Sequence, residues 1–205
     1  MGDTAYPVIY PRCCFHLAPS SGVWCILRAT DIHSLTQHPG FEGQDYYFHG
    51  NLPMKWVRVV GVIVAIDDFA GRRAWTIDDS SGQCIEAVKP FLETNERPGS
   101  GHSLFKGAKQ TPPYEEIDVG DVVDVKGSLS KFRHEMQIKV EKMAVVETTE
   151  REMVLWEKRA AFRRSVLSLP WKLDKKVVRR CQREAERDQS KKKKRSKQPT
   201  TNKEA

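Results

Sequence analysis

The 205-residue sequence is 39% hydrophobic and 30% charged, which is typical of a globular protein with a polar extension. No apolar run approaches the ~18 residues of a membrane-spanning helix, and the first residues lack the pattern of a secretory signal. The net charge of +7 is uneven, because residues 172–205 carry +9 and the remainder carries −2. Nucleic-acid binding by the folded part would therefore require a local basic patch.

Residues 1–54 are expected to form an extension that packs on the domain after it. Residues 23–28 have a strand pattern, and residues 30–37 favour a short helix capped by Thr30 or Asp31. The extension holds more aromatic side chains than a free arm would, namely Phe41, Tyr46, Tyr47 and Phe48. The five cysteines form no C-x-x-C pair, so we expect reduced thiols and no metal site.

Three strands joined by short turns follow, predicted over residues 55–67, 72–78 and 83–89. The first is dense in Val and Ile and is interrupted by Gly61, which in such a run often marks a bulge or a bend. The turns at 68–71 and 79–82 contain the Asp, Ser and Gly residues that tight turns favour. These three segments predict a meander of neighbouring strands.

A long connection separates this meander from two further strands. Residues 90–118 contain four prolines and three glycines, with room for one short helix. Strand alternation resumes over 119–129 and 135–147, around a loop at 130–134. This order predicts a mainly β protein built on the five-stranded Greek-key barrel of an OB-fold over residues 55–147. A five-stranded sandwich or an SH3-like barrel would show similar alternation.

Residues 148–170 predict a helix with two apolar stripes. Thr149 and Glu152 form a capping-box pattern at its start, and Pro170 ends it. One stripe suffices to dock on the barrel, so the helix is expected to bind a partner with the other, unless both cover the barrel. The partner-binding residues are expected to be Met153, Trp156, Ala160, Phe162, Val166 and Leu167.

Residues 171–205 are expected to form a basic, largely disordered tail. A charged helix is possible over 174–188, and residues 190–205 have almost no apolar side chains. The KKKKRSK run fits a nuclear localisation signal, a phosphate-binding arm or a solvated tail without a partner.

Several strings together resemble one known family. They are WVRVVGVIVAID, WTIDDSSGQCIE, DVGDVVDVKGSL, the helix from WEKR to LSLPW, and the earlier CFHLAPS, LRATDIHSL and YYFHGNLPMKWVR. In their order and density they resemble the middle OB-fold subunit of the fungal CST telomere-capping complex, which is itself similar to the middle subunit of replication protein A. The resemblance covers about residues 13 to 171.

The resemblance implies a function in the nucleus, at the telomeric region of chromosomes. It implies binding of single-stranded telomeric DNA with modest affinity, and pairing with a small OB-fold subunit through the C-terminal helix. It also implies end protection, and contacts with the large CST subunit and DNA polymerase alpha-primase. No cofactor is implied. Many family members carry a C-terminal winged-helix region, which nothing in this sequence resembles.

The DNA-binding residues follow from OB-fold geometry together with this resemblance. Single strands are held by stacking on aromatic rings and by cations at the phosphates, and the groove lies over strands 2–3 and loops 1–2 and 4–5. Phe132 falls where the family places an aromatic that stacks on a base; burial in the barrel mouth is the alternative. Trp75 is a groove platform or a core residue. The complete expected set is Arg72, Arg73, Trp75, Lys89, Lys131, Phe132, Arg133 and His134.

An enzymatic function is not expected. The paired acids at 67–68 and 78–79 adjoin turns, where capping is their expected role. The six histidines lack metal-ligand spacing, and neither a nucleophile elbow nor a phosphate loop is present. Two alternatives stay open: an OB-fold interaction scaffold with little intrinsic DNA binding, and a general replication protein A middle subunit.

Overall fold

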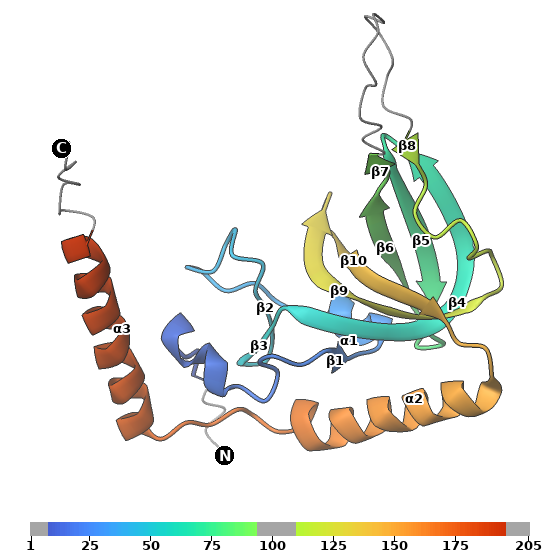
Figure 1. The fold of residues 1–205 in the computed structure, drawn as a ribbon. Coiled ribbons are helices and arrows are strands. Elements are labelled where there is room, and N and C mark those ends of the chain that lie inside the picture. The colour runs from blue at the N-terminus through green and yellow to red at the C-terminus, as the bar shows by residue number, and fades with distance from the viewer. Residues whose placement is uncertain (1–7, 94–109, 196–205) are drawn as a thin grey trace, which may run out of the picture.

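A closed five-stranded barrel forms the centre of the structure, a computed structural model that describes residues 8–93 and 110–195 (Figure 1). Its strands are β4 (Trp56–Phe69), β5 (Arg72–Asp78), β6 (Cys84–Pro90), β9 (Val122–Phe132) and β10 (Glu135–Val145). They are hydrogen-bonded in the order β4-β5-β6-β10-β9, and β9 returns to pair with β4. This order and closure confirm the predicted OB-fold barrel.

The long first strand, β4, serves both sides of the barrel. Residues 56–62 pair with β9 and residues 62–69 pair with β5. The strand-forming run of Val and Ile residues makes this double role possible, since alternate side chains fill the interior along its whole first half. Inward-facing residues of all five strands form the core, including Val57, Val59, Ile63, Trp75, Ile77, Ile85, Val123, Val125, Leu129 and Ile138.

Gly61 allows a close backbone approach and does not itself form a bulge. The register shift in the β4–β5 ladder lies between Ile63 and Ala65. A Cβ atom on Gly61 would overlap the Asp78 carbonyl group and lie 2.9 Å from the Asp79 Cα. A glycine is therefore needed where the backbone at the end of β5 lies against β4.

The connection between β6 and β9 carries a small two-stranded ladder of β7 (Leu92–Glu93) and β8 (Gln110–Thr111). Residues 94–109 are outside the described part of the chain. Residues 90–93 and 110–118 contain no helix, so the short helix allowed here by the sequence has no counterpart in those segments.

The N-terminal extension packs on the barrel as predicted. It comprises the 3-10 helix η1 (Arg12–Leu17), β1 (Cys25–Ile26), α1 (Ala29–His33) and the hairpin of β2 (Tyr47–His49) and β3 (Leu52–Met54). Strand β1 pairs in parallel with β4, and Tyr47 and Phe48 are buried. Helix α1 starts earlier than expected, because Arg28 is its N-cap and donates its backbone N–H to the Asp31 carboxylate.

Helix α2 (Thr149–Phe162) follows the barrel and crosses the side opposite β7 and β8 (Figure 1). Its N-cap is Thr148, one residue before the expected Thr149, and the Thr148 hydroxyl accepts from the Arg151 backbone N–H. The helix continues as a π-helical turn, η2 (Arg163–Leu167). None of the helices in the described residues combines the length and apolar character of a membrane span.

The C-terminal segment is more ordered than predicted. Trp171 and Cys181 are buried in the main core, and α3 (Lys175–Arg195) is helical through part of the predicted disordered region. The buried Asn51 side chain accepts from the Trp171 backbone N–H and donates to its carbonyl, at 3.0 and 2.7 Å. The boundary expected at residue 171 is therefore wrong. Residues 196–205 are outside the described part.

The five cysteine thiols are free, and Cys14, Cys25 and Cys181 are buried. Burial, together with the neighbouring Cys13 and Cys181, raises the pKa of the Cys14 thiol to about 12, and burial alone raises that of Cys25 to about 12. These thiols therefore stay protonated at neutral pH and act as small core side chains.

Candidate partner-binding and nucleic-acid surfaces

Two arginines, Arg159 of α2 and Arg163 of η2, fix this helix against the barrel and the N-terminal extension. Arg159 contacts the Asp79 carboxylate at 2.9 Å, and Arg163 contacts Asp31 of α1 at 2.5 Å. The Asp79 side chain is fully buried. Leu155 of α2 is buried beside Ile26 of β1 and Val60 of β4, and it supplies the apolar contact of the helix with these strands. The direction in which α2 presents its outer face is therefore set by charge pairing as well as packing.

Asp78 and Asp79 cap the β5–β6 turn, as predicted. Asp78 accepts from the Ser80 backbone N–H at 2.8 Å, and Asp79 accepts from the backbone and the hydroxyl of Ser81. Asp79 also accepts from the Ala29 backbone N–H at the start of α1. One carboxylate therefore joins the turn, the extension and, through Arg159, helix α2. Sequence reasoning missed that last contact, because the residues are 80 positions apart.

Asp31 is held in its charged form. Burial alone would raise its pKa, but hydrogen bonds from Arg28 and Arg163 outweigh burial, so its pKa lies below the usual value. A carboxylate with a depressed folded-state pKa stabilises the fold above its unfolded pKa of ~3.9. That contribution is lost as the pH falls through the folded-state pKa.

The variant Asp31→Asn is expected to be less stable by roughly 1.5–3 kcal/mol at neutral pH, the usual range for a hydrogen bond to a charged group. The difference in free energy of unfolding between wild type and variant should stay constant above about pH 5 and shrink as the pH falls below ~4. Urea denaturation across this pH range measures it. A gap that widens on acidification would contradict the assigned ion pair.

The outer face of α2 carries an apolar stripe that the rest of the described chain leaves uncovered. Met153 is 56% and Trp156 is 41% exposed, and Ala160 lies on the same side of the helix and is also exposed. The stripe, from here on the α2 outer stripe, consists of these three residues. They are the part of the predicted partner-binding set that is free to bind.

The other three predicted partner-binding residues face the protein itself. Leu167 is buried in the main core, and Phe162 and Val166 are half-buried against it. Phe162 and Val166 lie seven and eleven positions after the buried Leu155, so helical spacing places them on its side. For Leu167 the cause lies in η2, since a π-helical turn holds more residues than an α-helical turn and rotates the side chain at its end relative to 3.6-residue spacing. Leu167 therefore leaves the line of Met153 and Trp156, and its assignment to the partner face is wrong.

A cluster of two phenylalanines and two arginines joins the loops predicted to bind DNA. The Arg72 guanidinium lies 5.6 Å from the ring centroid of Phe69 and 5.9 Å from that of Phe132, and Arg133 lies 5.2 Å from the Phe132 centroid. Phe69 and Phe132 are 43% and 42% exposed. The structure thus brings together three predicted residues and adds Phe69, which sequence reasoning missed.

The tight β9–β10 hairpin determines where Phe132 points. The loop is shorter than the predicted range of 130–134, since β9 extends to Phe132 and only Arg133 and His134 form the turn. Both have positive φ, 47° and 74°, the pattern of a type I′ hairpin turn. Phe132 is thereby held at a strand end on the outer face, whereas the exposed Lys131 belongs by alternation to the opposite face.

Trp75 is a core residue and not a groove platform. It is fully buried and makes an edge contact with Tyr114 at 5.9 Å between ring centroids. Alternation along β5 places Ala74 and Thr76 on the opposite, groove-forming face. The prediction that Trp75 contacts DNA is therefore wrong, and strand β5 offers no aromatic side chain to the groove.

Arg73 and Lys89 lie on the same face as Trp75, at the mouth of the barrel. Arg73 forms a two-point ion pair with Asp68, at 2.7 and 2.8 Å, which lowers the pKa of Asp68 and raises that of Arg73. The Lys89 ammonium lies 5.2 Å from the Tyr114 ring centroid and 3.4 Å from the Glu141 carbonyl oxygen. The structure therefore separates both residues from the Phe132 cluster.

A hollow of about 500 Å³ begins at Arg72 and runs over β6 and β10. It is lined by Ala70, Gly71, Arg72, Val88, Pro90, Ser130, Gln137, Lys139, Val140 and Glu141. This hollow and the Phe132 cluster together are named the OB groove. Lys139 adds an exposed cation to this lining and was not among the predicted residues. Alternation along β10 places it on the outer face and could have indicated it. Within residues 8–93 and 110–195, no three His, Cys, Asp or Glu side chains gather as a possible metal site.

Comparison with known proteins agrees with this architecture. The family described as telomere regulation protein Stn1 matches residues 30–205. Protein stn1 of Schizosaccharomyces pombe is 26% identical over 154 residues, which are 75% of this chain and 43% of that protein. The chain therefore spans less than half of this curated relative.

Two solved structures share the fold. The crystal structure of the S. pombe Stn1–Ten1 complex is 23% identical, with 71% of this chain and 95% of that chain covered and a TM-score of 0.56. The crystal structure of yeast Stn1 and Ten1 is 19% identical, with 87% and 91% covered and a TM-score of 0.61. The resemblance inferred from the sequence strings is confirmed: the chain belongs to the Stn1 family of telomere regulation proteins.

Proposed function

We propose that this chain pairs with a small OB-fold protein of the Ten1 kind through the α2 outer stripe. The observation that carries the proposal is the exposure of Met153, Trp156 and Ala160 on a helix whose neighbouring face is fixed to the protein by Leu155 and Arg159. An aromatic anchor flanked by smaller apolar side chains is the usual centre of a protein interface. Both structural relatives described above were solved with Ten1.

The pair is proposed to act in the nucleus, at the telomeric region of chromosomes, as the end-protecting middle part of a CST-like complex. Membership of the Stn1 family supports this placement and favours it over a general replication protein A subunit. The large CST subunit and DNA polymerase alpha-primase are further proposed partners. The function is one of binding and assembly and involves no chemical reaction.

Co-expression with the small OB-fold partner from the same organism tests the pairing directly. Light scattering after size exclusion is expected to give a mass equal to one copy of each chain, stable on dilution. The chain alone is expected to be less soluble, because the outer stripe then faces water. Two monomer peaks, or a homodimer that excludes the partner, would contradict the proposal.

The OB groove is proposed to hold single-stranded DNA. Phe132 is the stacking platform, and Arg72, Arg133 and Lys139 are placed to contact phosphates. Ala74 and Val88 offer no stacking surface, so most of the affinity must come from the cluster at one end. This feature favours the second candidate function, an interaction scaffold that touches DNA weakly.

Phe132→Ala decides between these two functions. Loss of one stacked base is expected to lower affinity for a single strand by about 5- to 150-fold. Fluorescence anisotropy with the full chain at about 0.15 M salt measures it, since interactions between exposed charges more than ~8 Å apart are largely screened there. The exposed Val119→Ala is the matched control, because it lies outside the groove. Equal affinities for wild type and Phe132→Ala would favour the scaffold.

A further inference from the structure

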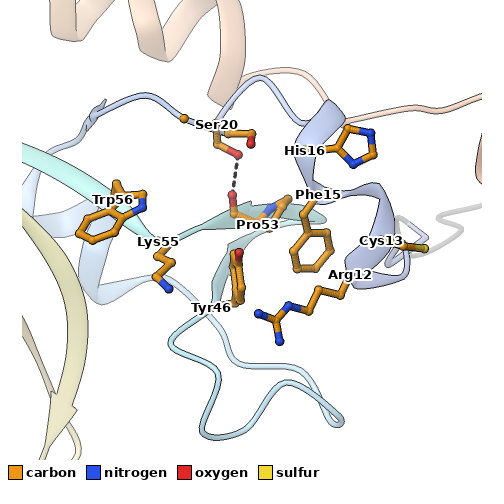
Figure 2. A pocket seen from close by; sticks show the side chains of 11 residues that line it. Arg12, Cys13, Phe15, His16, Ser20, Tyr46, Pro53, Lys55 and Trp56 are labelled. Carbon is orange, nitrogen blue, oxygen red and sulfur yellow. Dashed lines mark hydrogen bonds between the residues drawn. The ribbon is translucent and has the colours of Figure 1, made fainter. Parts of the chain in front are cut away.

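A second group of aromatic and cationic side chains lies where the N-terminal extension meets β4; Trp24 and Arg12 are exposed, and Tyr46, Lys55 and Trp56 are half-buried. Trp24 and Trp56 pack edge to face at 5.3 Å between ring centroids, and Trp24 is 40% exposed. The Lys55 ammonium lies 5.6 Å from the Tyr46 ring centroid and 5.7 Å from that of Trp56, and the Arg12 guanidinium lies 5.7 Å from Tyr46. Figure 2 shows Lys55 between Trp56 and Tyr46, with Arg12 beyond Tyr46. These five residues are named the extension surface.

The extension surface borders a hollow of about 400 Å³ with a basic lining. Its lining includes Arg12, His16 and Lys55 and contains no carboxylate. Within the described residues, neither Lys55 nor Arg12 takes part in a salt bridge. Their charges are therefore available to a ligand, and the lining favours an anionic one.

The extension surface and the OB groove are connected by residues that line neighbouring hollows. Glu141 lines both the groove and a small hollow bounded by Val23, Trp24 and Trp56. Trp56 and Gly22 in turn line both this small hollow and the hollow of Figure 2. The three hollows are therefore neighbours, in an order from Arg72 past Glu141 and Trp56 to Arg12.

We propose that the extension surface is a second binding site for single-stranded nucleic acid, which lengthens the path of a strand that leaves the OB groove. Bases stack on Trp24 and Trp56, and phosphates contact Lys55 and Arg12, which the Tyr46 ring holds in place between them. Alternating aromatic faces and cations along a groove are how proteins hold a single strand without reading its sequence. The proposal rests on DNA binding by the OB groove, because that groove sets the direction of the strand.

Oligonucleotides of two lengths separate this site from the groove. A strand of ~4 nucleotides can fill one OB groove, whereas one of about 12 can also reach the extension surface. Trp24→Ala in the full chain is expected to lower affinity for the longer strand by about 5- to 150-fold and to leave the shorter one unchanged. Phe132→Ala is expected to weaken both. Lys55→Gln should reduce the salt dependence for the longer strand by about one phosphate contact.

Indole fluorescence gives a second measure that does not depend on affinity. Stacking of bases on Trp24 and Trp56 should quench emission when the longer strand binds, and Trp24→Phe with Trp56→Phe should remove that quenching while binding persists. Circular dichroism melts confirm folding, which exposed Trp24 should not control.

The outcomes of the two proposals are distinguishable. If Phe132→Ala weakens both strands and Trp24→Ala weakens neither, the extension surface is not a nucleic-acid site and the groove stands. If Trp24→Ala instead weakens capture of the protein partner, the surface is a protein interface and the inference is wrong. If Trp24→Ala weakens the longer strand while Phe132→Ala weakens neither, the extension surface binds a strand by itself, and both the groove assignment and the proposed path from the groove are wrong.

Discussion

Trp156→Glu is expected to abolish pairing with the small OB-fold partner while leaving the barrel folded. The indole is 41% exposed at the centre of the α2 outer stripe, so its removal disturbs no core contact. In the complex, the glutamate would place an unpaired carboxylate in a desolvated interface. Interface anchors of this kind account for about 2–4 kcal/mol or more, so affinity should fall by at least roughly 30-fold. Isothermal titration measures the loss.

Lys158→Glu is the matched control for this variant. Residues two positions apart in an α-helix lie ~200° apart around its axis, so Lys158 is on the far side of the helix from Trp156. Both substitutions introduce glutamate on an exposed position of α2. Lys158→Glu should keep most of the affinity. If the two variants lose affinity equally, charge on the helix matters and the outer stripe is not the anchor.

Gly127→Ala is expected to cause the largest loss of stability. Gly127 lies in β9, between Val57 of β4 and Val140 of β10. A Cβ there would overlap the Lys139 carbonyl group and lie 2.6 Å from the Ile138 Cγ2 atom. Because the obstacle is the backbone of a paired strand, relief requires a shift of β10. We expect a loss of about 3 kcal/mol or more, measured by urea denaturation or, for an insoluble variant, by the soluble fraction.

Ser128→Ala controls for the change at the neighbouring position. Ser128 follows Gly127 in β9, and its side chain points to the other face of the sheet and is half-buried. This variant should stay within about 1 kcal/mol of wild type. A Gly127→Ala variant that matches Ser128→Ala in stability would show that the barrel accommodates the methyl group, and that the close approach of β9 and β10 is not required.

The barrel could be predicted from sequence because each strand carries its own signal. Residues 72–78 were predicted as a strand and form β5 without any shift. The alternation of β-branched and polar residues sets which face is buried, and the Asp-Ser-Ser-Gly turn fixes the connection. Other small β folds show the same alternation of residues. The sequence strings that resemble the family were therefore needed to identify the order of the strands as that of an OB-fold.

The face of a single residue was harder to predict. Trp75 and Phe132 are both aromatic residues that were expected to contact DNA, yet one is fully buried and the other 42% exposed. A shift of one position in a strand moves a side chain to the other face, so the choice depends on register, which the sequence does not specify at strand ends. Leu167 shows the same sensitivity in a helix, where one π-helical turn moved it from the stripe to the core.

The order of the C-terminal segment depends on contacts that are distant in sequence. Around Trp171 and Cys181 the composition is strongly charged, which locally favours disorder. The order comes from Asn51, and from Tyr10, which accepts a hydrogen bond from the Leu173 backbone N–H and packs edge to face on Trp171. These partners are more than 100 residues away, so no local pattern indicates them.

The central claim is that the α2 outer stripe binds the protein partner and the OB groove binds DNA, as separate surfaces. Hydroxyl-radical footprinting tests it directly, because Met153, Trp156 and Phe132 are exposed and readily oxidised. The partner should protect Met153 and Trp156 and leave Phe132 unchanged, and a single strand should protect Phe132 and leave Met153 and Trp156 unchanged. Oxidation of Met153 and Trp156 that persists at saturating partner would contradict the account.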